Sequence, residues 1–160
     1  MDIWAIVVVF CLLLFALGWP TINQHIDQEN TSKRSRGERT CIEVMKRLFP
    51  FHHHDHNARP DWLVNDWPGR KTPARRLELD IFIAELKLAV EFNGRQHYMF
   101  VPYFHASNAA FLAQRLRDQR KVALCREKGI DLIVVPFDTP SIEAFLMEHP
   151  AVQSRLPASS

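Results

Sequence analysis

The chain has 160 residues, a formal net charge of +2 and 47% hydrophobic residues, which fits one folded domain plus an apolar segment. It contains no internal repeat and no low-complexity tract, so the composition excludes a repeat protein and a biased, low-complexity chain. The small net charge excludes no further class, because the basic residues are clustered rather than spread evenly.

Residues 3–19 form an uncharged and almost wholly apolar run. The run lies at the short end for a membrane helix, and Trp4 and Trp19 would mark the two interfaces. A cleaved signal peptide is the alternative, because residues 16–18 include small residues of the kind found at cleavage sites. The lack of Lys or Arg before the run and the Pro20 behind it favour an anchor spanning residues 1–20.

A polar linker is predicted at 21–34, followed by a domain at 35–150 and a C-terminal tail at 151–160. Basic residues cluster at the start of this domain: Lys33, Arg34, Arg36 and Arg39. Because positive charges next to a membrane helix stay on the cytoplasmic side, we expect the domain to face the cytosol. Cys41 and Cys125 fall on helical patterns and need not pair, which fits a reducing compartment.

Residues 36–49 are predicted to form a helix that ends at Pro50. Its apolar residues recur at helical spacing: Ile42, Met45, Leu48 and Phe49. Glu38 lies in the first turn, where it either serves a site or is favoured by the helix dipole, and both roles can hold together. Glu43 is the alternative acid on this helix.

A dense run of histidines at 52–56 follows this helix. A structural zinc site needs ligands at fixed spacing, usually with cysteines, and nothing downstream completes such a set. We interpret the run as a loop insertion with incidental metal affinity. Residues 59–63 are predicted to pack this loop against the sheet, which leaves Asp61 as a minor catalytic candidate.

Residues 77–93 predict a β-hairpin with one continuous apolar face and a turn centred on Glu85 and Leu86. The register that aligns its apolar residues has three pairs: Leu79 with Phe92, Ile81 with Val90, and Ile83 with Leu88. The same register sets Asp80 directly opposite Glu91, where like charges destabilise a sheet. A divalent cation between them would turn this repulsion into coordination. The alternative is a solvated face that happens to carry two acids.

Polar groups follow the hairpin at once. Gly94 can end the strand or let a backbone approach a ligand closely. Gln96 and His97 come next, and histidine can act as general base, proton donor or metal ligand near neutral pH. A single histidine after a strand is more often structural, but the nearby carboxylates favour a role in the site.

The second half of the domain predicts a long helix at 108–128, with Ser107 as N-cap and Gly129 as left-handed C-cap. Its expected core stripe has five members: Phe111, Leu112, Leu116, Val122 and Cys125. Residues 130–136 predict a central buried strand, and a final helix is expected from Pro140 to about His149. With a short strand near Tyr98, the order gives an α/β sandwich with a mixed sheet.

The pattern of Asp80, Glu91, Gly94, Gln96 and His97 resembles the PD-(D/E)XK, or restriction-endonuclease-like, nucleases. It is most similar to very-short-patch-repair-like nucleases and nuclease-like proteins of large DNA viruses, and the resemblance covers roughly 35–138. It implies a three-layer core in the order α-β-β-β-α-β. It also implies a site for Mg²⁺, or Mn²⁺, at the two acids, with Glu38 assisting.

The chain departs from the family pattern at Asn93, which stands where a lysine is expected. The resemblance implies that Gln96 and His97 replace that lysine, with Lys121 as the alternative source of a cationic group. Lys121 belongs to an Arg-Asp-x-x-Lys string at 117–121 that is similar to one in the family.

These observations predict a membrane-anchored endonuclease that hydrolyses phosphodiester bonds in DNA, on a host or virion membrane if the chain is viral. His97 is expected to orient or deprotonate water, and Gln96 to contact phosphate. The residues expected to bind DNA are basic: Arg70, Lys71, Arg75, Arg76 and Lys121. Three alternatives stay open: an inactive nucleic-acid tether, a protein-binding domain, and a homodimer that cuts both strands.

Overall fold

A computed structural model describes residues 34–66 and 75–157. The apolar run at 3–19, most of the linker, and the basic residues Arg70 and Lys71 lie outside these ranges. Within the described ranges, no helix combines the length and the hydropathy that crossing a bilayer requires.

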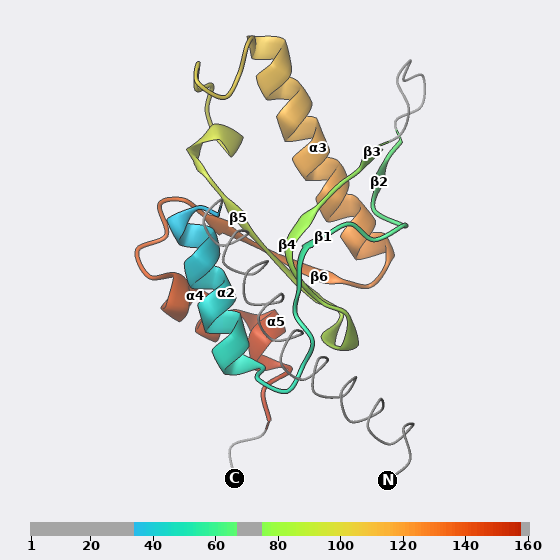
Figure 1. Ribbon diagram of the computed structural model, residues 1–160, viewed down its shortest axis with the longest axis vertical. Helices are drawn as coiled ribbons and strands as arrows, with labels where there is room; N and C mark the ends of the chain where they lie inside the picture. The colour runs from blue at the N-terminus through green and yellow to red at the C-terminus, as the bar shows by residue number, and fades with distance from the viewer. Residues whose placement is uncertain (1–33, 67–74, 158–160) are drawn as a thin grey trace, which may run out of the picture. The chain divides into compact units, whose positions relative to one another are not determined.

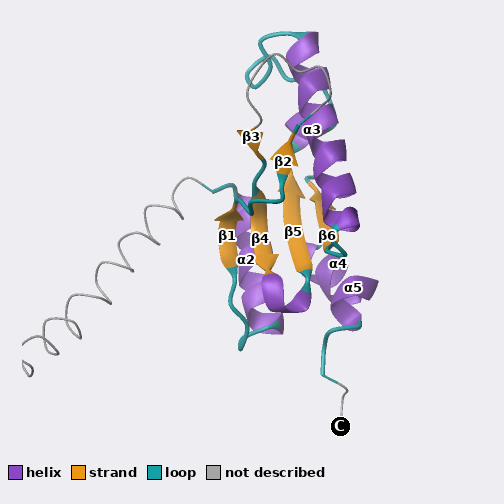
Figure 2. Ribbon diagram, turned by 90° about the vertical axis from the view of Figure 1, so that its right-hand side faces the viewer, coloured by secondary structure: helices purple, strands orange, loops and turns teal. Residues whose placement is uncertain are grey.

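The fold is built on a mixed sheet of four strands (Figure 2). Its strand order is β1 (Asp55–Ala58), β4 (Leu79–Ile83), β5 (Leu88–Asn93) and β6 (Asp131–Pro136). The first three strands pair antiparallel, whereas β5 and β6 pair parallel. A separate short ladder joins β2 (Val64–Asn65) to β3 (Arg75–Arg76). The predicted α/β class with a mixed sheet is therefore confirmed.

Helices cover both faces of the sheet (Figure 1). One face packs against α2 (Arg36–Leu48), α4 (Ile142–Glu148) and α5 (Pro150–Gln153) through Leu88, Val90 and their neighbours. The other face packs against the C-terminal part of α3 (Asn108–Glu127) through Ala89 and Leu132. Since residues that alternate along β5 belong to different clusters, the domain has two hydrophobic cores on opposite sides of one sheet.

The predicted hairpin register holds only where β4 and β5 form a regular ladder. Ile81 pairs with Val90 and Ile83 with Leu88, as expected. The predicted continuous apolar face is wrong, because Leu77 and Leu79 belong to the core under α3, whereas Ile81 and Ile83 belong to the core under α2. The division falls at Asp80, where side-chain hydrogen bonds to the neighbouring backbone replace the ladder.

Four other local predictions are corrected by the structure. The histidine run leads into β1, and its residues from Asp55 form an edge strand rather than a loop insertion. The region before Tyr98 is a 3-10 turn, η2 (Arg95–His97), instead of a strand. β6 lies at the end of the described strand order, because the crossover through α3 places it outside β5. The predicted last helix begins after Ser141 instead of at Pro140, and the Ser141 side chain accepts a hydrogen bond from Ala144 N. A further helix, α5, occupies part of the expected tail.

Helix α3 begins and ends as predicted, but its expected core stripe is confirmed only at Cys125. Ser107 accepts a hydrogen bond from Ala110 N at its start, and Gly129 has a φ of 66° behind its end. Leu112, Leu116 and Val122 are exposed, while burial is confined to Leu124 and Cys125. The N-terminal half of α3 extends beyond the sheet (Figures 1 and 2), and neither hydrophobic core found among the described residues includes a side chain from it.

Gly37 lets helix α2 approach the hairpin closely. A Cβ atom on Gly37 would lie 2.1 Å from Cζ of Phe92, far inside contact distance. The ring of Phe92 packs against the core beneath α2, and its backbone N–H donates to Asp80. The absence of a side chain at Gly37 therefore fixes the distance between α2 and the strand that carries Glu91.

Gly37→Ala is expected to destabilise the domain by about 1–3 kcal/mol through overpacking. Helix propensity alone would instead stabilise it by about 0.5–1 kcal/mol, so the sign of the change separates the two effects. Chemical denaturation of both proteins measures it. An alanine variant that is more stable than the wild type would show that α2 does not press on Phe92.

Candidate active site

Asp80 and Glu91 meet where the hairpin ladder is interrupted. The backbone N–H of Phe92 donates to Asp80 Oδ2 at 2.9 Å. The backbone N–H of Asp80 donates to Glu91 Oε1 at 3.3 Å. Each carboxylate thus binds the backbone of the other strand, and the two acids lie side by side as the sequence predicts.

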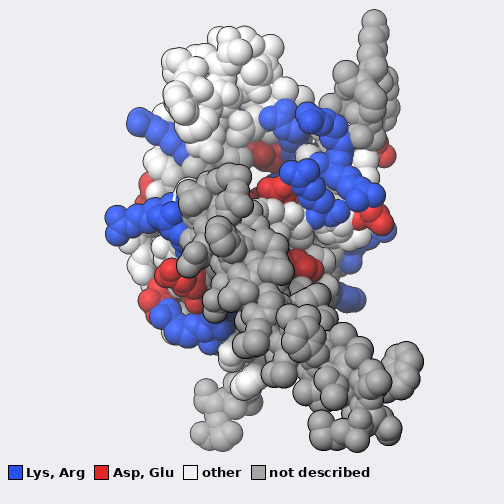
Figure 3. Space-filling model, viewed as in Figure 1, with Lys and Arg blue, Asp and Glu red and all other residues white. Residues whose placement is uncertain are grey.

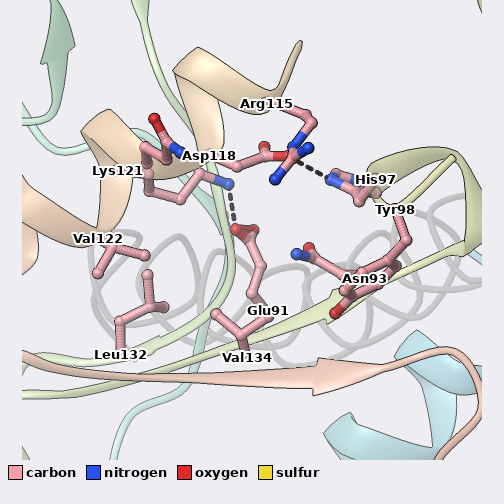
Figure 4. A pocket seen from close by; sticks show the side chains of 11 residues that line it. Glu91, Asn93, His97, Tyr98, Arg115, Asp118, Lys121, Val122, Leu132 and Val134 are labelled. Carbon is pink, nitrogen blue, oxygen red and sulfur yellow. Dashed lines mark hydrogen bonds and ion pairs between the residues drawn. The ribbon is translucent and has the colours of Figure 1, made fainter. Parts of the chain in front are cut away.

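Lys121 reaches this acid pair from helix α3. Its Nζ atom donates to Glu91 Oε2, and the two side chains are only 14% and 8% exposed, respectively (Figure 4). The structure therefore places a buried lysine beside the second acid, although Asn93 stands where the family pattern has one. Among the residues that the sequence offers in place of the family's lysine, Lys121 is the one that supplies a cationic group in contact with Glu91.

Burial dominates the electrostatics of the two acids. It raises the pKa of the Glu91 carboxyl to about 8, and the attraction of Lys121 only partly opposes this rise. Burial also raises the pKa of Asp80, against the hydrogen bond from Phe92 and the charge of Lys121. Without a cation, burial therefore favours the protonated form of Glu91 near neutral pH, and a bound divalent ion would favour the ionised form instead.

The metal-free protein is expected to lose stability as the pH rises from about 5 to 8. Glu91 keeps its proton up to about pH 8 in the folded chain, but a glutamate in the unfolded chain ionises near its usual pKa of about 4.3. Raising the pH through this window therefore favours the unfolded chain, and the loss stops above the folded pKa. Thermal melts in EDTA across this range should show the slope in the wild type and a flatter profile in Glu91→Gln. Parallel profiles for the two proteins would show that Glu91 does not cause the loss of stability.

His97 and Asp118 form a second polar pair beside the acids. His97 Nδ1 lies 2.8 Å from Asp118 Oδ2, and both side chains are mostly buried. Because a carboxylate only accepts hydrogen bonds, Nδ1 carries the proton in this contact, and in a neutral ring Nε2 is left as an acceptor. The pair joins η2 to α3, so its two members come from segments far apart in the sequence.

Two adjoining hollows surround Glu91. A hollow of about 180 Å³ is lined by Asp80, Glu78 and Arg117, among others. A second, of about 240 Å³, is lined by Tyr98, Arg115, Gln119 and an apolar floor. Both hollows share the same five residues: Glu91, Asn93, His97, Asp118 and Lys121. One continuous site therefore contains the acids, the lysine and the histidine–aspartate pair.

Sequence reasoning missed several of these residues as members of the site. Asp118 is three positions before Lys121, which puts both on one face of α3, so the Arg-Asp-x-x-Lys string was the available signal. Asn93 lies two positions after Glu91 in β5, so both side chains are on the same face of the strand. Arg115 and Tyr98 carried no signal of their own, because only the packing of α3 over η2 brings them to the hollow.

Other predicted site residues lie elsewhere. Glu38 lines neither hollow, although its charge and that of Asp80 both act on the buried thiol of Cys41, whose pKa rises to about 12, chiefly through burial. Gln96 folds its amide back against Gly94 instead of lining either hollow. Arg76 pairs with Asp61 at 2.6 Å.

Among the described residues, no group of three or more His, Cys, Asp or Glu side chains is arranged to hold a metal. This includes the histidine run, where His53 pairs with Asp55 and His54 contacts the carbonyl of Phe49. The pair of Asp80 and Glu91 still fits Mg²⁺, which is usually bound by one or two carboxylates together with water and substrate phosphate. Two oxygen-donor acids with raised pKa values are a suitable donor set for that ion.

The chain is 35% identical over 134 residues to the uncharacterized protein 307L of Invertebrate iridescent virus 6, covering 79% of this chain and 68% of the relative. It is 37% identical over 113 residues to the uncharacterized protein 094L of Frog virus 3, covering 70% of this chain and 68% of the relative. The chain belongs to their family. The chain is also 39% identical over 105 residues to the uncharacterized protein 033L of Invertebrate iridescent virus 3, covering 64% of this chain and half of that relative. No family model and no solved structure matches the chain.

Proposed function

We propose that this chain is a divalent-metal-dependent nuclease of the PD-(D/E)XK type that hydrolyses phosphodiester bonds in DNA. The observation that carries the proposal is the buried cluster of Asp80, Glu91 and Lys121 at an interrupted hairpin ladder. Two acids and a lysine in contact would be costly as a structural feature alone, because burying charges seldom stabilises a fold. Such an arrangement is common at catalytic sites, where burial shifts the pKa values of acids and bases.

Each residue has a role in this proposal. Asp80 and Glu91 would hold Mg²⁺ or Mn²⁺, which when bound supplies an activated water and neutralises charge on the phosphate. Lys121 would stabilise negative charge that develops on the phosphate oxygens. His97, held by Asp118 with Nε2 as acceptor, would orient the attacking water and take its proton.

Basic side chains near the acids support DNA as the substrate. Figure 3 shows lysine and arginine side chains gathered around acidic residues on the side of α3 and the β2–β3 ladder. Arg117 and Lys121 line the hollow that contains Asp80, and Arg115 lines the adjoining one. These charges would attract the phosphate backbone and offset the field of the two acids.

A membrane tether through residues 3–19 is part of the proposal and rests on their apolar sequence. The basic residues that follow favour a domain on the cytoplasmic side of a host or virion membrane.

The proposal is tested with the full chain, kept in a mild detergent because of its apolar N-terminal run. The protein is incubated with plasmid, linear duplex and single-stranded DNA, in EDTA and in Mg²⁺ or Mn²⁺. We expect cutting that requires the metal. A folded protein that cuts none of these substrates at any metal concentration would overturn the nuclease.

His97→Ala is expected to slow cleavage by about 10²–10⁴-fold, the usual contribution of a general acid or base. His53→Ala is the matched control, because His53 also pairs with an aspartate, Asp55, at 2.9 Å. The control should cut at the wild-type rate. Equal rates in the two variants would remove His97 from the mechanism.

A second candidate function is a nucleic-acid-binding domain that does not cut. The observation in its favour is that Lys121 and the backbone of Asp80 together engage both oxygens of Glu91. This arrangement would leave Asp80 to bind a cation without Glu91. Metal-independent binding of DNA by a protein without cleavage activity is the result that supports this candidate.

A further inference from the structure

The larger of the two hollows has a composition that metal and phosphate chemistry leaves unexplained. Its floor is apolar, formed by Val122 of α3 and by Leu132 and Val134 of β6 (Figure 4). The amides of Asn93 and Gln119 stand at its walls. A metal ion and a phosphate need charges and oxygen donors, whereas an apolar floor of this kind suits a group with an apolar surface beside the site.

We propose that this hollow receives an unpaired nucleobase next to the phosphate that is cut, so that the substrate is DNA with single-stranded nucleotides at the cleavage point. The inference rests on the proposed DNA substrate. An apolar floor suits the face of a base, while side-chain amides offer both donors and acceptors to its edge. A base that remains stacked in a duplex cannot enter such a pocket.

One aromatic ring at the hollow and a second ring beside it strengthen the inference. Tyr98 lines the hollow, and its ring lies 5.7 Å from the ring of Phe137. Both rings are exposed, at 44% and 38%, respectively. Exposed aromatic rings provide stacking surfaces for unpaired bases, and they do so with little regard to sequence.

Arg115 completes the surroundings of the hollow. It extends from α3 toward the space near Asp118 and His97 (Figure 4). A guanidinium there can contact the phosphate of the nucleotide whose base is bound, or lie flat on a neighbouring base. The hollow shares Glu91 and Lys121 with the acid site, so a bound base would be held directly beside the reacting phosphate.

The inference is tested by DNA binding in EDTA, where no metal-dependent cutting interferes. The full chain in detergent is titrated with three labelled probes of one sequence: a single strand, a blunt duplex, and a duplex with an unpaired tail. A 2-aminopurine in the unpaired segment reports on the environment of a base. Val122→Phe fills the hollow, and Leu116→Phe is the matched control on the same helix, since these residues are 48% and 49% exposed and Leu116 lines neither hollow.

We expect the single strand and the tailed duplex to bind about 10-fold more tightly than the blunt duplex, since one stacked base contributes on this order. Val122→Phe should abolish that preference and the change in 2-aminopurine emission, and Leu116→Phe should keep both. Tyr98→Ala, a second variant, should weaken binding of the unpaired probes alone. Equal binding of all three probes by the wild type, or an unchanged preference in Val122→Phe, would overturn the inference.

The two proposals fail separately. A preference for unpaired DNA that Val122→Phe removes, in a protein that never cuts, supports the base pocket and overturns the nuclease. Metal-dependent cutting whose rate and substrate preference are unchanged in Val122→Phe supports the nuclease and overturns the base pocket.

Discussion

Replacing Asp80 by asparagine is expected to reduce the rate of DNA cleavage by about 10³-fold or more, without unfolding the domain. The expected loss reflects a metal contribution of several kcal/mol to the transition state. Asparagine keeps the size of the side chain and an oxygen that can accept the hydrogen bond from Phe92 N. It removes the charge that a divalent ion needs, so activity should fall while the hairpin stays intact.

Asp61→Asn is the matched control for this experiment. Asp61 is 87% exposed and pairs with Arg76 outside both hollows. The same chemical change there should leave the cleavage rate within about twofold, because exposed ion pairs contribute little. Circular dichroism measures whether each variant is folded, and product formation measures cleavage by the same preparations. Cleavage that persists in Asp80→Asn would show that another residue holds the metal.

Lys121→Met is expected to have the second largest effect, on both stability and activity. Removing one partner of a buried ion pair costs about 3–5 kcal/mol when the other charge is left alone. Protonation of Glu91, whose pKa is already about 8, should keep the loss near the lower end below that pH. Losing the cation near the phosphate should slow cleavage by about 10²–10³-fold.

The double variant Glu91→Gln with Lys121→Met separates these two effects. It removes both charges, so it should recover much of the stability that Lys121→Met loses, while cleavage stays at least as slow as in Lys121→Met. Lys46→Met on the exposed side of α2 is the control for loss of a surface lysine. Denaturant midpoints and cleavage rates measure both effects. A Lys121→Met protein with wild-type stability and rate would show that the contact with Glu91 has no role.

The elements that periodicity defines could be predicted from the sequence. Helix α2 and both ends of α3 follow from helical spacing and from the caps at Ser107 and Gly129. The juxtaposition of Asp80 and Glu91 follows from the hairpin register, in which the next residues, Ile81 and Val90, pair as expected, although the apolar alternation breaks at Asp80. These predictions depend on residues close together in the sequence.

The features that depend on tertiary packing could not be predicted. β1 has the sequence DHNA, which shows no apolar alternation, and it forms because β4 offers an edge at Phe82 and Ile81. Leu112 and Leu116 in the N-terminal half of α3 match a core stripe, yet the helix extends past the sheet and leaves them exposed. The contact between His97 and Asp118 spans 21 positions and exists only because α3 crosses over η2.

Lys121 illustrates the same limit within the site. The spacing after Glu91 directs attention to Asn93, and the sequence offers Gln96 and His97 as nearby replacements. The structure instead brings in a lysine from a helix 30 positions away. Only the Arg-Asp-x-x-Lys string indicated this helix, because its aspartate and lysine share one helical face.

The most direct test of the central claim is a calorimetric titration of Mn²⁺ into the full chain, with Asp80→Asn and Glu91→Gln alongside. If these acids form the metal site, the wild type should bind the ion saturably at about pH 8, where Glu91 ionises, and each variant should lose that binding. Wild-type protein that binds no Mn²⁺, or variants that bind it as well as the wild type, would contradict the assignment.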